Sequence, residues 1–143
     1  MRSRSRSTWV AFALVAVIAA PVVGTARYDA TVQTDAAKLK NPVAADAKSI
    51  GEGKKLYGAQ CASCHGLAGK GDGKGGALLK PLPADFTDDA WKHGSGDGDI
   101  FVAIRDGIKQ TGMRAFGGRI TTQEIWHLVN YLRTLGPKPA KSH

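Results

Sequence analysis

Residues 58–73 read GAQCASCHGLAGKGDG, and this stretch contains both cysteines of the chain. Two small residues separate Cys61 from Cys64, and His65 follows the second cysteine directly. Four kinds of site use cysteines with this spacing: a disulfide, a zinc site, a redox-active thiol pair and a covalently attached cofactor. Each of them requires something different of the remaining sequence.

Three of these sites leave part of the pattern unexplained. A structural zinc site needs four ligands, whereas the other histidines, His93, His127 and His143, are isolated from one another. A thioredoxin-like thiol pair follows a strand in a βαβ unit, whereas glycine-rich helical sequence surrounds this pair. A disulfide is compatible with an exported protein but gives His65 no role.

The fourth site explains all three residues, because C-x-x-C-H is the attachment sequence of c-type haem. Residues i, i+3 and i+4 of a helix project to one side. Cys61 and Cys64 can therefore bond the two vinyl groups while the imidazole of His65 reaches the iron from the same side. The sequence predicts one covalent haem c, with Cys61 and Cys64 as its thioether anchors and His65 as the proximal iron ligand.

The distal iron ligand is predicted to be Met113, the only methionine apart from Met1. It lies in the polar, glycine-flanked stretch QTGMRAFGG at 110–118, where core filling, the usual role of methionine, gives little reason for it. His93 is the rival for this position. Methionine and histidine together are a standard ligand pair that raises the haem potential. Since two protein ligands leave no open position on the iron, the sequence favours a one-electron carrier over an enzyme.

The first 26 residues have the pattern of an export signal. Arg2, Arg4 and Arg6 precede an apolar run at Trp9–Val23, and small residues allow cleavage after Ala26. The run of 15 residues is shorter than the ~20 that a membrane-spanning helix needs. Cleavage and a periplasmic location are therefore expected. An uncleaved membrane anchor is the alternative, and only that alternative predicts contact with a membrane.

The chain is basic, with a formal net charge of +8. Removal of residues 1–26 takes away three arginines and no acidic residue, which leaves +5. This excess predicts docking on an acidic face of redox proteins, with Lys54, Lys55, Lys70 and Lys74 as the candidate docking charges. Nucleic acid is not an expected partner, because the lysines are scattered and no arginine–aromatic cluster is present.

Three amphipathic helices are predicted from caps and apolar periodicity. The first begins after Ser49, with Glu52 completing a capping box, and runs through the C-x-x-C-H sequence. The second is capped by Asp97 or Asp99 and the third by Thr121 with Glu124. The apolar stripe of the second helix consists of Ile100, Phe101, Ile104 and Ile108, and that of the third of Ile125, Leu128, Val129, Leu132 and Leu135.

Residues 49–135 resemble the class I c-type cytochromes, which are small periplasmic monohaem proteins of bacteria. The resemblance rests on the haem sequence, the Met113 loop, the closing amphipathic helix and the stretches GKGDG and PLPADFTD. It implies an all-α cytochrome c-like fold of three to five helices around one haem, with long glycine-rich loops. The expected organisation is a signal at 1–26, an extended arm at 27–48, a cytochrome c domain at 49–136 and a flexible tail at 137–143.

The resemblance also implies particular contacts. The first and last helices are expected to cross near the haem, where Gly53 and Tyr57 meet Leu128 and Tyr131. A proline carbonyl is expected to accept a hydrogen bond from His65, and both Pro81 and Pro83 qualify. Many relatives have proline directly after the ligand methionine, whereas Arg114 stands there in this chain.

The function implied by the resemblance is the transfer of single electrons outside the cytoplasmic membrane. One alternative is a haem-bearing electron-transfer subunit of a dehydrogenase or terminal oxidase complex. The other is a haem sensor, which requires an open iron site.

Overall fold

The computed structural model describes residues 35–88 and 91–136. Its elements are α2 (Ala47–Gln60), α3 (Ala62–His65), the 3-10 helix η1 (Lys74–Gly76), α4 (Asp97–Asp106) and α5 (Thr122–Leu135). A helical turn at 35–38 precedes them, and neither described range contains a strand. The all-α fold of three to five helices is therefore confirmed. The predicted signal, residues 27–34 of the arm and the tail at 137–143 lie outside the described residues.

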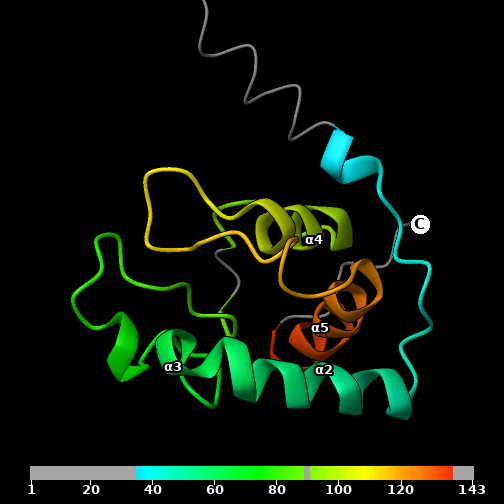
Figure 1. The fold of residues 1–143 in the computed structure, drawn as a ribbon, viewed down its shortest axis with the longest axis horizontal. Helices are drawn as coiled ribbons and strands as arrows, with labels where there is room; N and C mark the ends of the chain where they lie inside the picture. Colours follow the sequence, from blue (N-terminus) through cyan, green and yellow to red (C-terminus); the bar gives the residue numbers. More distant parts are fainter. Residues whose placement is uncertain (1–34, 89–90, 137–143) are drawn as a thin grey trace, which may run out of the picture.

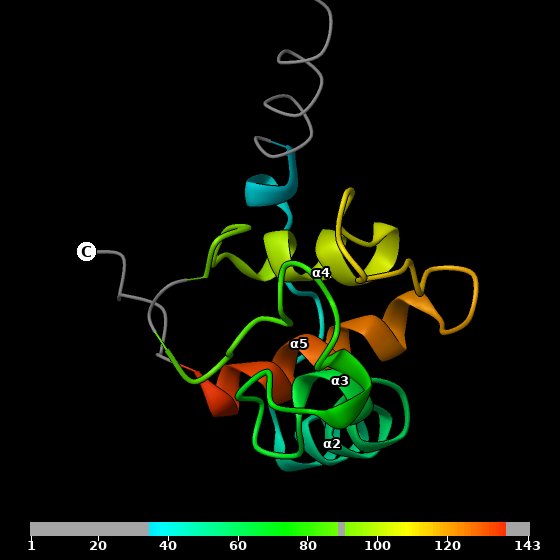
Figure 2. The same ribbon diagram turned by 90° about the vertical axis from the view of Figure 1, so that its left-hand side faces the viewer.

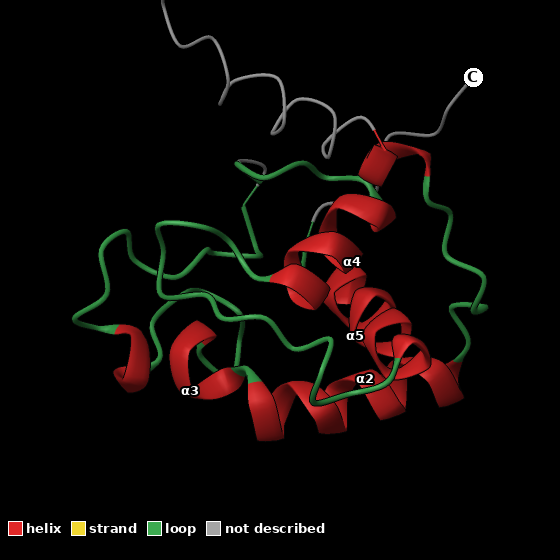
Figure 3. Ribbon diagram, turned by 45° about the horizontal axis from the view of Figure 1, so that its top comes forward, coloured by secondary structure: helices red, strands yellow, loops and turns green. Residues whose placement is uncertain are grey.

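Helix α5 lies between α2 and α4 (Figures 1 and 2) and contacts both of them. Two long loops connect the helices, one between α3 and α4 and the other between α4 and α5 (Figure 3). Within the two described ranges, no helix is long and apolar enough to cross a membrane.

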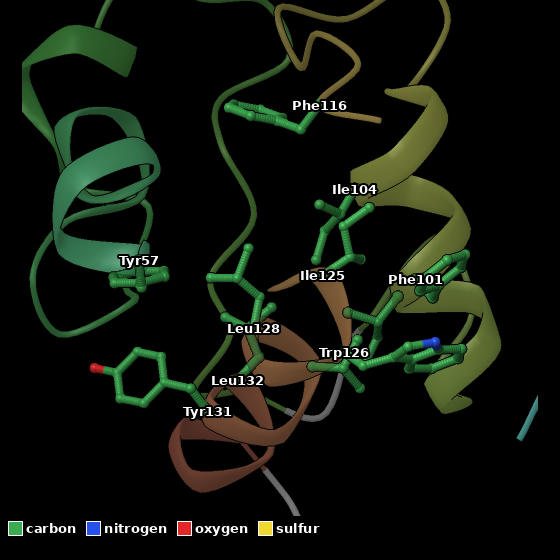
Figure 4. Packing of buried hydrophobic residues seen from close by; sticks show 11 residues of the cluster. Tyr57, Phe101, Ile104, Phe116, Ile125, Trp126, Leu128, Tyr131 and Leu132 are labelled. Carbon is green, nitrogen blue, oxygen red and sulfur yellow. The ribbon is translucent and has the colours of Figure 1, made fainter. Parts of the chain in front are cut away.

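The central position of α5 explains why so much of its surface is buried. The predicted stripe is confirmed, because Ile125, Leu128, Val129 and Leu132 are almost completely buried and Leu135 is partly buried. Trp126 and Tyr131 are buried on either side of this stripe (Figure 4). The Trp126 ring stacks on Phe101 of α4 at 4.2 Å between centroids, and the Tyr131 ring lies 5.2 Å from that of Tyr57 in α2.

The backbone of α2 lies directly against α5 at Gly53. A Cβ atom at this position would overlap the carbonyl oxygen of His127 and would lie 2.8 Å from the Cβ of Tyr131. Only glycine allows two helix backbones to come this close, since any side chain would separate them. Of the predicted contacts between the first and last helices, those of Gly53 and Tyr57 with Tyr131 are confirmed, and Leu128 is buried in the same core.

The start of α2 differs from the prediction. Asp46, not Ser49, is the N-cap, and its carboxylate accepts the Ser49 N–H at 2.7 Å. Because Asp46 already caps the helix, Ser49 lies inside the first turn and its hydroxyl is free to point inward. Glu52 does not complete a capping box; it forms an exposed ion pair with Lys55 at 3.0 Å.

The start of α4 also differs from the prediction, because Gly96 is its N-cap. The Asp99 carboxylate accepts the Gly96 N–H at 3.0 Å, whereas Asp97 pairs with Arg133 at 2.7 Å. The helix ends at Asp106, so Ile108 of the predicted stripe lies beyond it and is only partly buried. The capping box of Thr121 and Glu124 at the start of α5 is confirmed, with N–H···O distances of 2.7 and 3.2 Å.

A buried polar network joins α2, α5 and the chain that precedes α2. The Asn130 side-chain amide donates to the Ser49 hydroxyl at 2.8 Å and contacts the Val43 and Ala44 carbonyls at 3.2 Å. Its carbonyl oxygen accepts the Asn41 amide at 2.7 Å, and the Ser49 hydroxyl is 2.7 Å from Nδ1 of His127. The last residues of the predicted arm are therefore hydrogen-bonded to α5.

Two glycines of α2 provide a matched test of the crossing. Gly53→Ala should lower the free energy of unfolding by about 2 kcal/mol, because the new methyl group overlaps the α5 backbone. Gly58→Ala introduces the same methyl group in the same helix with no atom within 4 Å, and it should raise stability by about 0.5–1 kcal/mol. Denaturant unfolding of the two variants measures the difference; equal effects would contradict this account of the crossing.

Candidate haem-binding site

Cys61 lies at the junction of α2 and α3. The predicted continuous helix is interrupted here, since α2 ends at Gln60 and Cys61 has φ −117°. The carbonyl of Cys61 accepts the N–H groups of Cys64 at 3.1 Å and of His65 at 3.0 Å. The three residues of the motif therefore occupy one turn of backbone, as their spacing predicts.

The His65 side chain is buried and held at one ring nitrogen. Its Nδ1 is 3.2 Å from the carbonyl oxygen of Ala84. Because a carbonyl can only accept, Nδ1 carries the proton and Nε2 keeps its lone pair. Burial lowers the pKa of His65, although the Ala84 hydrogen bond partly opposes this. The lowered pKa favours the neutral imidazole, the form that binds a metal.

The acceptor is not the one that the resemblance implies. Neither Pro81 nor Pro83 bonds to His65; the backbone carbonyl of Ala84, one residue after Pro83, takes this position. The Pro83 carbonyl faces Gly71 instead, where it would overlap a Cβ atom if one were present. Nothing in the sequence indicates that Ala84 is the acceptor, since every residue of the loop has a backbone carbonyl.

Both cysteines are free thiols and partly buried. Burial, and then the nearby sulfur of Cys64, raises the pKa of the Cys61 thiol to about 11. This thiol is therefore protonated at neutral pH. Among residues 35–88 and 91–136, no three His, Cys, Asp or Glu side chains are arranged to hold a bare metal ion.

Met113 lies in the loop between α4 and α5 and is partly buried against the hydrophobic core. Its backbone N–H donates to the Thr111 hydroxyl at 3.1 Å and its carbonyl accepts the Ile108 N–H at 3.0 Å. This loop extends to the side of the molecule that carries α3 (Figure 1). A Cβ atom at Gly112 would lie 2.6 Å from the Leu79 side chain, so the Met113 loop contacts the loop that follows His65. His93, the rival ligand, is on the surface before α4.

The surroundings of the turn fit a large apolar group. Leu67, Leu78 and Leu82, all in the loop after His65, are 83%, 94% and 64% exposed. Exposed large apolar side chains in the loop that follows the C-x-x-C-H turn are available to contact an apolar group bound at that turn. Two free thiols, an available imidazole nitrogen and these leucines match the donors and contacts that a covalently attached porphyrin requires.

Comparison with known families supports this fit. The family model for cytochrome c matches residues 50–136. The chain belongs to the cytochrome c family. Its cofactor is therefore haem c, which this family binds covalently.

Two curated proteins illustrate the relationship. The cytochrome is 32% identical over 100 residues to the CcoP subunit of the cbb3-type cytochrome c oxidase of Azospirillum sp. strain B510, covering 62% of this chain and 31% of that protein. It is 32% identical over 85 residues to thiosulfate dehydrogenase of Stutzerimonas stutzeri strain A1501, covering 59% and 27%. The chain thus aligns with about a third or less of the length of these relatives.

Solved structures show the same fold. A chain of the reducing HAO-like protein complex of Kuenenia stuttgartiensis superposes with a TM-score of 0.62 at 28% identity, covering 71% of this cytochrome and 49% of that chain. Cytochrome cL of Methylophaga aminisulfidivorans has a TM-score of 0.53 at 24% identity, covering 64% and 57%. The second match concerns the fold alone.

Tyr57 connects the helix crossing to the haem turn. Its hydroxyl donates to the carbonyl of Gly66, the residue after His65, at 2.7 Å. Burial, and then the nearby Cys61, Tyr131 and Asp72, raises the pKa of Tyr57 well above its ordinary value of 10.0. Below pH 10 the phenol is neutral in both the folded and the unfolded chain, so titration of Tyr57 leaves the stability unchanged there.

Above pH 10 the unfolded chain loses this proton while the folded chain keeps it, and stability falls as pH rises. The slope due to Tyr57 approaches about 1.4 kcal/mol per pH unit. Denaturant unfolding at pH 9 to 12 should show this loss in the wild type and a shallower one in Tyr57→Phe. At pH 7 the same variant should be about 1 kcal/mol less stable, because the buried Gly66 carbonyl loses its donor. Parallel pH curves for the two proteins would refute the assignment.

Proposed function

We propose that this cytochrome carries single electrons through one haem c, held by thioethers to Cys61 and Cys64 and ligated by His65 and Met113. The observation that carries the proposal is the combination at one turn of two free thiols and a neutral imidazole whose Nδ1 is already bonded. When bound, the haem supplies one-electron exchange between Fe(III) and Fe(II). The hydrogen bond from His65 to Ala84 orients the ring and increases the basicity of Nε2.

Met113 is the distal ligand in this proposal. Its backbone is held on both sides by the bonds to Thr111 and Ile108, so the loop conformation does not depend on a proline at position 114. A thioether favours the reduced iron. With His65 and Met113 both bound, substrates and gases have no position on the metal, which favours a carrier over an enzyme or a sensor.

A second candidate function is that of an electron-transfer subunit in a larger enzyme. The relatives named above include an oxidase subunit and a dehydrogenase, and in each the aligned region is a minor part of the protein. Copurification of a catalytic chain with the native cytochrome would favour this role. In both cases we place the protein in the periplasm, in agreement with the predicted export signal.

The docking surface for redox partners is proposed to surround the loop after His65. Exposed Lys70 and Lys74 lie in this loop. Lys54 is also exposed, whereas Lys55 already pairs with Glu52. Exposed cations in this loop fit a partner with an acidic face, since opposite charges orient the encounter.

Replacement of Met113 tests the ligand assignment. Met113→Ala should abolish the charge-transfer band of thioether-ligated ferric haem and allow the reduced protein to bind carbon monoxide. Arg114→Ala changes the next residue of the same loop, which is exposed, and should leave both properties unchanged. Visible and near-infrared spectra measure them. If the wild type lacks the band and Met113→Ala leaves carbon monoxide binding unchanged, another residue, with His93 as the first candidate, is the distal ligand.

Charge reversal tests the docking surface. Lys74→Glu should slow reduction by anionic ferrocyanide by about two- to fivefold at low salt, because the local attraction is lost. Lys48→Glu makes the same net change on an exposed residue at the start of α2, ~20 Å along the helix from the cysteines. Stopped-flow rates for the two variants should differ at low salt and converge at high salt. Equal slowing at low salt would exclude Lys74 from the docking surface.

A further inference from the structure

Phe86 lies flat against the imidazole of His65. The two ring centroids are 4.6 Å apart and the ring planes differ by 20°. This is a stacked arrangement, distinct from the tilted and edge contacts that Phe86 makes with Trp91 at 5.6 Å and with Tyr57 at 6.5 Å. One face of the imidazole is therefore covered by a flat aromatic ring.

Phe86 is itself firmly held, although it lies in a loop. Its N–H donates to the Gly69 carbonyl at 2.7 Å, which ties it to the loop after His65. Its carbonyl faces the end of α5, where a Cβ atom at Gly136 would lie 2.5 Å from it. The rings of Trp91 and Tyr57 also contact the phenyl group, and these contacts restrict its movement away from His65.

Two different restraints thus reach His65 from one short segment. The hydrogen bond from Nδ1 to the Ala84 carbonyl fixes the tautomer and restrains the direction of Nε2. At 3.2 Å this hydrogen bond is long, and it tolerates partial rotation of the imidazole about the Cβ–Cγ bond. A flat ring parallel to the imidazole opposes that rotation, since turning would lose the face-to-face contact or cause a clash.

We propose that Phe86 is a positioning residue that fixes the orientation of the proximal imidazole plane in the haem-loaded protein. The inference rests on the proposed function, because it requires His65 to be an iron ligand. It assigns to a side chain of the loop a restraint on the ring plane that adds to the hydrogen bond from His65 to Ala84. The orientation of the imidazole plane would contribute to the splitting of the iron d orbitals, and the g values of the oxidised protein report that splitting.

The test uses electron paramagnetic resonance of the oxidised, haem-loaded protein, in which the largest g value of low-spin iron depends on the ligand planes. Phe86→Leu keeps an apolar side chain but removes the flat ring, so the largest g value should shift and its signal should broaden. Phe86→Tyr retains the ring and should restore the wild-type position and width. Thermal unfolding of each variant reports its general loss of stability.

Phe101→Leu is the matched control. It removes a buried phenylalanine that stacks on Trp126 instead of His65, and it should lower stability without changing the largest g value. An unchanged signal in Phe86→Leu, or an equal change in Phe101→Leu, would overturn the proposal. A wild-type protein without a low-spin haem signal would instead overturn the proposed function.

A measurement on the wild type covers the case in which Phe86→Leu yields no haem-loaded protein. In the reduced, diamagnetic state, nuclear Overhauser effects between the Phe86 ring protons and the carbon-bound protons of the His65 imidazole should be present. Their presence supports the stack in the loaded protein, and their absence would overturn the inference whatever the variant does.

Discussion

The close approach of α2 and α5 at Gly53 is the constraint on which the rest of the structure depends. Because no side chain separates the helices there, Tyr57, one turn further along α2, is pressed against Tyr131 of α5. This packing positions the Tyr57 hydroxyl to donate a hydrogen bond to the Gly66 carbonyl, at the end of the haem turn. The geometry of the cysteines and of His65 is thereby linked to a contact between two helix backbones.

The loop after His65 has almost no regular structure, yet backbone hydrogen bonds fix its conformation. A short helix such as α3 leaves carbonyls without partners at its end, and here loop amides provide them. The Gly71 N–H donates to the His65 carbonyl at 2.9 Å and the Gly73 N–H to that of Cys64 at 3.2 Å. The chain then returns to place Ala84 and Phe86 on the imidazole. These hydrogen bonds stabilise the site, a role that the hydrogen bonds of helices and sheets have elsewhere.

Much of this arrangement could be predicted from the sequence, because some residues have few alternatives. The C-x-x-C-H turn, the apolar stripe of α5 and the capping box of Thr121 and Glu124 each combine residue type with a specific spacing. Ser49 and Asp46 are both residue types that cap helices well. Only the folded structure shows that the Ser49 hydroxyl is buried and bonded to Asn130, which leaves Asp46 as the cap. The role of the Ala84 carbonyl could not be predicted from the sequence, since every residue has a backbone carbonyl. The position of Phe86 could not be predicted either, because it lies in a loop without apolar periodicity.

The hydrogen bonds of Asn130 have a mechanical consequence. Asn41, Val43 and Ala44 are joined to this one side chain, and Ala36 and Leu39 contact the start of α4 at Gly98. A pulling force from the amino-terminal side of the chain would therefore reach α4 and the middle of α5 before it could strain the turn at Cys61–His65. Residues 36–44 therefore protect the haem-binding turn from tension applied on the amino-terminal side.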